Sequence, residues 1–162
     1  MREVELNTKD IELLIKELDD YKKVLDEKCQ ELIDRLADEG VTRAQWRFDM
    51  ATYDGDGKVK VEAVPDGKLR TYVVATGDAV LFIEFGAGYL MGYGHPEPMG
   101  YGPGTYPGKG HWDDPNGWWL PKAVQEATGK KKSFGNPPAA AMYNTVKDLE
   151  ERIAEIASEV FK

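Results

Sequence analysis

The chain has 162 residues, of which 41% are hydrophobic, a formal net charge of -8 and one cysteine, Cys29. This length suits a single domain with a real core, which we expect residues 1–162 to form. No apolar run approaches the roughly 18 residues that a membrane span needs. The negative charge argues against a protein whose main affinity comes from neutralising phosphates. The acidic N-terminus lacks the features of a secretion signal, which predicts a cytoplasmic protein.

The first predicted element is a long helix over residues 7–39. Its apolar residues recur every three or four positions, which is the spacing of one helical stripe. Asn7 or Thr8 can cap its start, and Gly40 can take the left-handed position at its end. At 1.5 Å per residue the helix would span roughly 50 Å. Because a compact domain of this size needs less, we expect part of the stripe to meet a neighbouring subunit.

After Gly40 the apolar period changes to two, which predicts strands. Asp54–Gly57 has the composition of a tight hairpin turn, and the other links between the strands are also short. Short links predict an antiparallel meander. Trp118–Leu120, ended by Pro121, could add a fifth strand at the edge. The four predicted strands of the meander cover residues 44–50, 59–63, 69–74 and 79–85.

A second amphipathic helix is predicted at the end of the chain. Asn136 precedes Pro137 and Pro138, as a capping residue does before prolines of a first helical turn. Apolar residues then recur at intervals of four and three from Met142 to Val160. The predicted fold class is therefore α+β, with a four-stranded antiparallel meander. Each helix has one apolar face, so we expect both helices to pack on one side of the sheet.

The most unusual segment is a glycine-rich and aromatic loop over residues 86–117. It holds more than half of the 17 glycines of the chain, and an ordinary connection has only about 4 to 6 residues. Flexible linkers are poor in aromatics, whereas Tyr and Trp are favoured interface anchors. We therefore expect neighbouring subunits or partner proteins to pack on this extended insertion. The candidate contact residues are Tyr89, Tyr93, Tyr101, Tyr106 and Trp112 in the loop, with Trp118 and Trp119 directly after it.

Some sequence features point weakly to a bound ion or nucleotide. Asp54 and Asp56 alternate as in a calcium-binding loop, but Lys58 and Pro65 stand where further ligands belong. The glycines of residues 86–94 follow a predicted strand, yet neither a Gly-Lys-Ser/Thr sequence nor a helix start follows them. A metal site lacks a cysteine pair or a helical His-x-x-x-His. Its candidate ligands are His95, Glu97, His111, Asp113 and Asp114.

Catalysis has little support in the sequence. There is no Gly-x-Ser-x-Gly nucleophile turn, and neither Ser133 nor Ser158 has an adjacent base. Glu84 and Glu97 could approach each other as paired carboxylates, but no other signal accompanies them. We therefore predict a protein that is not an enzyme and that has no cofactor and no metal.

Two charged features nevertheless stand out. Glu84 lies among apolar residues of its predicted strand, and burying a lone charge is costly. It must reach solvent, a partner or a hydrogen-bond network, and we interpret it either as a strand-end carboxylate or as a contact across a subunit boundary. The other feature is the only basic run, Lys130–Lys132, on a predicted loop tip. It is either simply solvated or, in a ring of copies, a set of positive tips facing DNA.

Two short motifs and the order of elements resemble the neck proteins of long-tailed phages. The motifs are Glu84-Phe85-Gly86-Ala87-Gly88 at the end of the meander and Gly135-Asn136-Pro137-Pro138-Ala139-Ala140-Ala141-Met142 at the start of the last helix. The insertion between them reaches Gly117-Trp118-Trp119. Neck proteins are head-tail connector or tail-completion proteins that also occur in prophages of Gram-positive bacteria. The insertion is longer here than in shorter family members.

The resemblance implies a structural virion protein of the neck, without enzymatic activity. It implies a ring, of six subunits by analogy, between portal-side connector and tail proteins, through which DNA passes without sequence-specific binding. By the same analogy, Glu84 and Phe85 mark the exit into the loop at a subunit or partner interface. Lys130, Lys131 and Lys132 are then candidate contacts in the DNA channel.

Two other functions stay open from the residues alone. The tyrosines of the loop, together with Trp112, could form a stacking platform for a small ligand or a glycan. A metal-dependent hydrolase could use His95, His111 and Asp113. A sugar panel followed by tryptophan fluorescence would test the first function, and elemental analysis would test the second.

Overall fold

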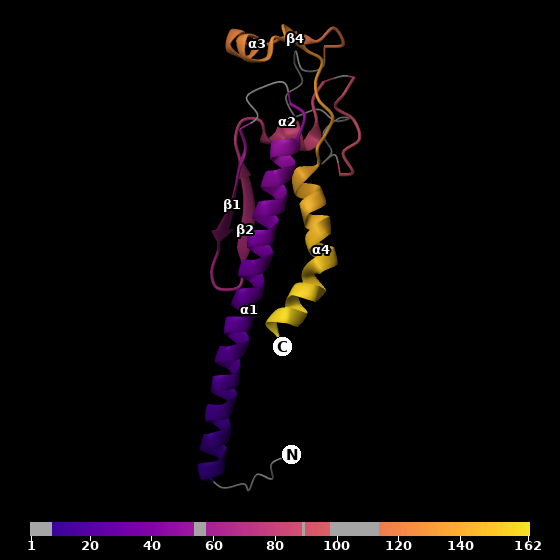
Figure 1. The fold of residues 1–162 in the computed structure, drawn as a ribbon. Helices are drawn as coiled ribbons and strands as arrows, with labels where there is room; N and C mark the ends of the chain where they lie inside the picture. Colours follow the sequence, from indigo (N-terminus) through magenta and orange to yellow (C-terminus); the bar gives the residue numbers. More distant parts are fainter. Residues whose placement is uncertain (1–7, 54–57, 89, 98–113) are drawn as a thin grey trace.

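A computed structural model describes residues 8–53, 58–88, 90–97 and 114–162. The molecule is elongated, and one long helix runs along most of it (Figure 1). In chain order the described elements are α1 (Thr8–Met50), β1 (Lys60–Pro65), β2 (Thr71–Thr76), α2 (Val80–Phe85), β3 (Trp118–Trp119), α3 (Lys122–Thr128), β4 (Lys132–Ser133) and α4 (Ala141–Val160).

Helix α1 continues through Gly40 to Met50, so the predicted end of the helix and the predicted strand over 44–50 are both wrong. Gly40 is buried inside the helix, where an added Cβ would lie 3.0 Å from Val73 and 3.2 Å from Leu149. The glycine thus allows two other elements to approach α1 closely, and it does not end the helix. Beyond it, Ala44 and Phe48 continue the helical stripe into the core.

Strands β1 and β2 form an antiparallel hairpin in which Val61 pairs with Ala75 and Ala63 pairs with Val73. The pairing of the second and third predicted strands is therefore confirmed. Val61 points into the core against α1, while Val64 and Tyr72 on the other face are exposed. The predicted turn Asp54–Gly57 lies outside the described residues.

The predicted fourth strand, 79–85, is wrong because residues 80–85 form helix α2. The amide of Ile83 donates to the carbonyl of Ala79 at 2.9 Å, and the Ile83 side chain is fully buried. A short run of apolar residues does not show whether it is a strand or a buried helix, because its periodicity is hidden. The chain therefore leaves the hairpin by a helical turn instead of adding a strand.

The predicted edge strand does exist as β3, but it pairs with β4 in a separate sheet and not with the hairpin. In the described part of the chain there are thus two sheets of two strands, and the predicted four-stranded meander is wrong. The expected packing of both helices on one sheet is wrong as well. Helix α1 packs against both strands of the hairpin and also against α4, so that α4 packs mainly on α1 (Figure 1).

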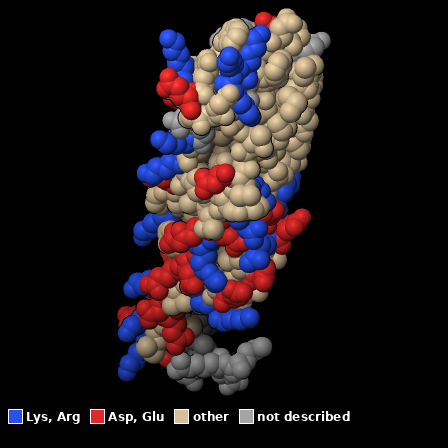
Figure 2. Space-filling model, turned by 45° about the horizontal axis from the view of Figure 1, so that its top comes forward, with Lys and Arg blue, Asp and Glu red and all other residues tan. Residues whose placement is uncertain are grey.

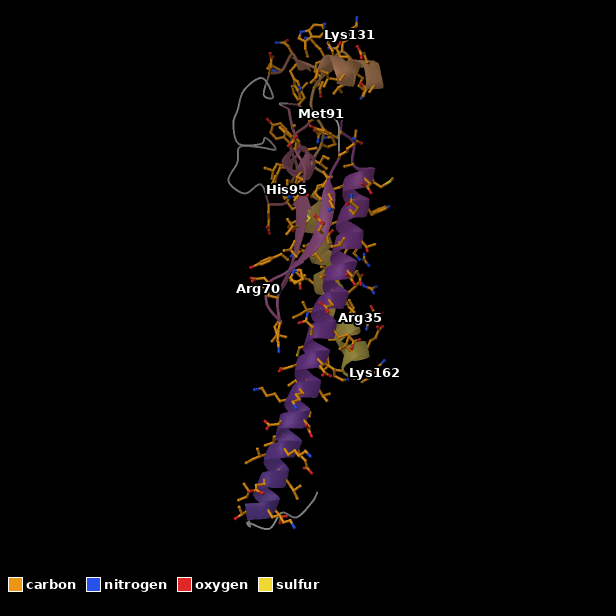
Figure 3. The ribbon with its side chains drawn as sticks, turned by 90° about the vertical axis from the view of Figure 1, so that its left-hand side faces the viewer. Arg35, Arg70, Met91, His95, Lys131 and Lys162 are labelled. Carbon is orange, nitrogen blue, oxygen red and sulfur yellow. The ribbon has the colours of Figure 1, made fainter. Side chains whose placement is uncertain are left out.

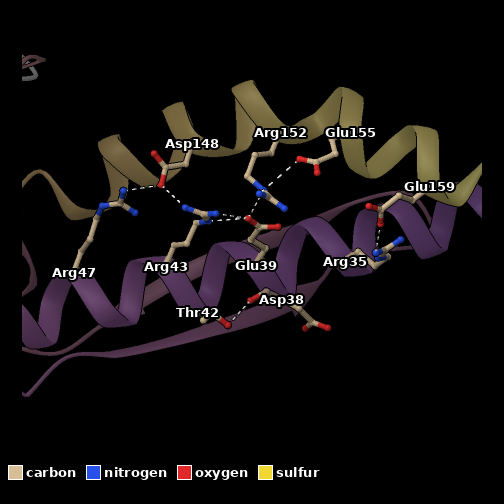
Figure 4. A network of polar contacts seen from close by, with 10 residues as sticks. All are labelled: Arg35, Asp38, Glu39, Thr42, Arg43, Arg47, Asp148, Arg152, Glu155 and Glu159. Carbon is tan, nitrogen blue, oxygen red and sulfur yellow. Dashed lines mark hydrogen bonds and ion pairs between the residues drawn. The ribbon is translucent and has the colours of Figure 1, made fainter.

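A row of ion pairs joins α1 to α4, and we call this row the seam (Figure 4). Asp148 accepts from Arg43 at 2.8 Å and from Arg47 at 2.7 Å. These two guanidinium groups, Arg47 before Arg43, lower the pKa of the Asp148 carboxyl below its ordinary value. In turn, the carboxylates of Glu39 and Asp148 favour the charged guanidinium and raise the pKa of Arg43. Further along, the seam contains the pairs Arg152–Glu39 and Arg35–Glu159.

Charged and uncharged side chains are unevenly distributed over the surface. On the face drawn in Figure 2, Lys, Arg, Asp and Glu crowd the part nearest the N-terminus, and other residues cover most of the opposite part. Among the described helices, none is long and apolar enough to cross a membrane.

Candidate functional site

The two motifs that carry the resemblance lie side by side in space. Ala87 and Asn136 form an antiparallel bridge, with N···O distances of 3.0 Å from Ala87 to Asn136 and 2.9 Å in the reverse direction. The amides of Ala139 and Ala140 donate to the carbonyls of Ile83 and Glu84. We call this unit, residues 82–88 with 135–143, the junction. It fixes both the start of the long loop and the start of α4.

Glu84 lies at the centre of the junction and is only 6% exposed. Its Oε2 accepts the backbone amide of Met142 at 2.8 Å, and its Oε1 accepts that of Tyr143 at 3.1 Å. The first amides of a helix have no partner within the helix, and they carry the positive end of the helix dipole. The carboxylate of Glu84 therefore caps α4 from a distant part of the chain.

His95 completes this arrangement from inside the long loop, and Figure 3 shows it close to the elements of the junction. Its Nε2 lies 3.3 Å from Oε1 of Glu84, and its Nδ1 accepts the amide of Glu97 at 3.0 Å. Because Nδ1 accepts, the proton of the neutral ring is on Nε2 and is donated to Glu84. The ring also packs against Phe85 and Tyr143, with centroids 4.6 and 5.8 Å away.

Glycines allow the two chain segments of the junction to come this close. A Cβ on Gly135 would lie 1.8 Å from the carbonyl oxygen of Ala87, and one on Gly88 would lie 2.3 Å from that of Phe134. Both residues also have positive φ. No residue with a side chain fits at either place without separating the two segments.

Asn136 has a different role from the predicted helix cap. Its side chain is buried and donates to the carbonyl of Phe82 at 2.9 Å. Helix α4 begins only at Ala141, after Ala140 has adopted a left-handed backbone with φ of 46°. The sequence does contain a signal for this, because residues 139–141 are all alanine and offer no side-chain acceptor to the helix. The missing acceptor is supplied by Glu84, the lone carboxylate in an apolar run elsewhere in the chain.

Glu84 thus reaches a hydrogen-bond network, which is one of the three outcomes that the sequence allows. Glu84 and Phe85 both stabilise the junction from within the subunit. His95 has both ring nitrogens engaged, and among the described residues no group of three His, Cys, Asp or Glu is placed to hold a metal ion. His111 and Asp113 lie outside the described residues, as do Asp54 and Asp56.

The predicted aromatic contacts fall into two groups. Tyr89, Tyr101, Tyr106 and Trp112 lie outside the described residues. Of the others, Trp119 is 65% exposed and Tyr93 is 47% exposed, whereas Trp118 is half-buried in β3. Further exposed apolar side chains are Leu90 and Met91 within the loop and Phe134 beside it.

The three lysines lie at the end of the molecule that is opposite the N-terminus, as the label of Lys131 in Figure 3 shows. Lys130 and Lys131 are exposed. Lys132 donates to the carbonyl of Asn116 at 3.2 Å and lies 5.1 Å from the ring centroid of Trp119. The structure therefore places this basic run beside an exposed aromatic.

A comparison with protein-family models, with curated proteins and with solved structures finds no match in any of the three.

Proposed function

We propose that the protein is a structural subunit of a phage neck, which joins head and tail as a ring around the DNA channel. The observation that carries this proposal is the junction. The motifs at 84–88 and 135–142, on which the resemblance to neck proteins rests, form one buried unit although about fifty residues separate them. Motifs that meet in space and depend on each other are better support than two short matches in sequence.

The geometry of the junction also fits a scaffold better than an enzyme. Both oxygens of Glu84 accept helix amides, and both nitrogens of His95 are engaged. A general base needs a free lone pair that faces a substrate. The pair instead anchors the loop to the start of α4, so that the loop can present side chains while its base stays fixed.

The surface around the loop has the character of a protein contact. Leu90, Met91, Trp119 and Phe134 are all between 45% and 65% exposed. Aromatic residues and Met are enriched at protein interfaces. We propose that portal-side or tail proteins bind here and that Lys130 and Lys131 lie near the DNA without reading its sequence.

The test is to mix the purified chain with the portal-side connector and tail proteins of the same genome. We expect a ring in electron micrographs, and loss of attachment in Trp119→Ala. Tyr72→Ala is the matched control, because Tyr72 is 48% exposed and has Arg70 over its ring as Trp119 has Lys132. The proposal is wrong if the wild-type chain attaches to none of these proteins and forms no ring.

A further inference from the structure

The first third of α1 has a wide apolar stripe that the described part of its own chain leaves exposed. Leu18 and Tyr21 are each 66% exposed, and Ile15 is 55% exposed. The remaining members are also more than a third exposed, and they are Ile11, Leu14 and Leu25. An isolated helix is marginal in water, and most helical stability in proteins comes from packing of an apolar face. The stripe therefore needs a partner.

The stripe is continuous with the one that packs inside the subunit. Further along α1, the same spacing continues through four residues that are half-buried in the subunit, namely Cys29, Leu32, Ile33 and Leu36. The packing of α4 on α1 ends near Lys28. The ammonium of Lys28 donates to the carbonyls of Val160 and Lys162 at the C-terminal end of α4. The tip of the hairpin ends at the same level, since Leu69 lines a cavity with Asp26 and Gln30. Figure 1 shows α1 extending well beyond both.

The spacing of the stripe identifies the kind of partner. Ile11, Leu14, Leu18, Tyr21 and Leu25 follow intervals of three, four, three and four, which is the heptad pattern of helices that pack side by side. With Ile15 added, the stripe is wider than a two-helix contact requires. Each helix can therefore contact a neighbour on either side.

The charges beside the stripe favour copies that point in the same direction. Glu17 lies on one flank of the stripe and Lys22 lies on the other. In a parallel pair, a residue on the Glu17 flank of one helix faces the residue five positions further along on the Lys22 flank of its neighbour. Glu17 of one copy therefore meets Lys22 of the other. In an antiparallel pair the Glu17 flank of one helix faces the Glu17 flank of the other, and the Lys22 flanks face each other, so the attraction between Glu17 and Lys22 is lost.

We infer that residues 11–25 of α1 bind the same residues of a second copy of this chain, in parallel. Subunits related by rotation about a ring axis have their corresponding helices pointing in the same direction along that axis. This contact therefore rests on the proposed function and adds an interface to it. Two heptads form a weak contact alone, but the other contacts of a ring hold neighbours together and raise their effective concentration. The stripe would then be buried only in the assembly.

The first test is analytical ultracentrifugation of the full chain over a wide range of concentration. We expect wild type to show species heavier than the single chain of 18.1 kDa. Leu18→Glu should remove them. Leu13→Glu is the matched control, because Leu13 is 47% exposed but lies about 200° around the helix from Ile11. This control should associate as wild type does.

A second set of variants tests the direction of the helices. Glu17→Lys or Lys22→Glu alone should weaken association roughly tenfold. The double variant Glu17→Lys with Lys22→Glu should restore it, because opposite charges face each other again. If the double variant stays dissociated, the helices are not parallel and the inference is wrong.

Failure of this inference can be told apart from failure of the proposed function. If wild type is monomeric at every concentration, or if Leu18→Glu associates as wild type does, the stripe is not the contact. Attachment to portal-side or tail proteins is measured separately and can persist in either case. Circular dichroism of Leu18→Glu should still show the thermal transition of wild-type monomer, because Leu18 lies outside the core of the subunit.

Discussion

The junction and the seam both hold α4 in place, but they do so in different surroundings. At the junction, Glu84 is 6% exposed and its carboxylate bonds to the amides of Met142 and Tyr143. At the seam, the side chains of Arg43 and Asp148 are 33% and 27% exposed. Water can replace a lost partner at the seam but not at the junction. The buried contact therefore decides where α4 begins, and the seam strengthens its packing along α1 by small increments.

The largest effect is expected where the two segments of the junction come closest. Gly135→Ala should lower the free energy of unfolding by about 3 kcal/mol or more, because the new Cβ would overlap the carbonyl of Ala87 and φ is positive. Gly67→Ala is the control, since Gly67 also has positive φ but has no atom within 4 Å of the added Cβ. Gly67→Ala should lower the free energy of unfolding by only about 1 kcal/mol. Urea unfolding measures both, and equal losses would show that the close approach does not matter.

A smaller but still large effect is expected from the cap of α4. Glu84→Ala should cost about 2 to 3 kcal/mol, because it leaves two helix amides and the ring of His95 without their acceptor in a buried place. Glu84→Gln should cost less, since one oxygen remains. The seam supplies the matched control in Glu159→Ala, whose partner Arg35 is about half exposed. Thermal unfolding should show a clearly lower midpoint temperature for Glu84→Ala and almost no change for Glu159→Ala. The reverse order would contradict the difference drawn between the junction and the seam.

The smallest effect is expected at the seam and depends on pH. The pKa of Asp148 is lowered in the folded protein from an ordinary value of 3.8, chiefly by its hydrogen bond to Arg47. A lowered pKa means that its stabilising contribution is present above about pH 4 and is lost as pH falls through the folded pKa. Asp148→Asn should therefore be less stable than wild type at neutral pH, by less than about 1 kcal/mol.

The measurement for Asp148 is the difference in unfolding free energy between wild type and Asp148→Asn as pH is lowered. The difference should shrink below pH 4, since the wild-type carboxyl then loses its charge too. Other carboxyls titrate in both proteins, so they cancel in the difference. A difference that stays constant into acid would mean that the charge of Asp148 contributes nothing.

Three parts of the fold follow from local pattern alone. Regular apolar spacing over many turns gives the two long helices, and alternation between two turn signals gives the hairpin of β1 and β2. These patterns are reliable because each places the apolar residues of its own element on one face. The importance of Glu84 and of the segment around Asn136 is also visible in sequence, since a charge among apolar residues requires an explanation.

Only the tertiary structure decided the rest. Gly40 is inside a helix and not at its end because Val73 and Leu149 pack against it, and a glycine signal does not show which neighbour will come close. Residues 80–85 form a helix although five of the six are apolar, and a short run without polar alternation does not separate strand from helix. Glu84 caps α4 from 57 positions upstream of Ala141, and no local rule connects residues so far apart. Sequence determined which residues needed partners, and the packing of distant segments decided which partners they have.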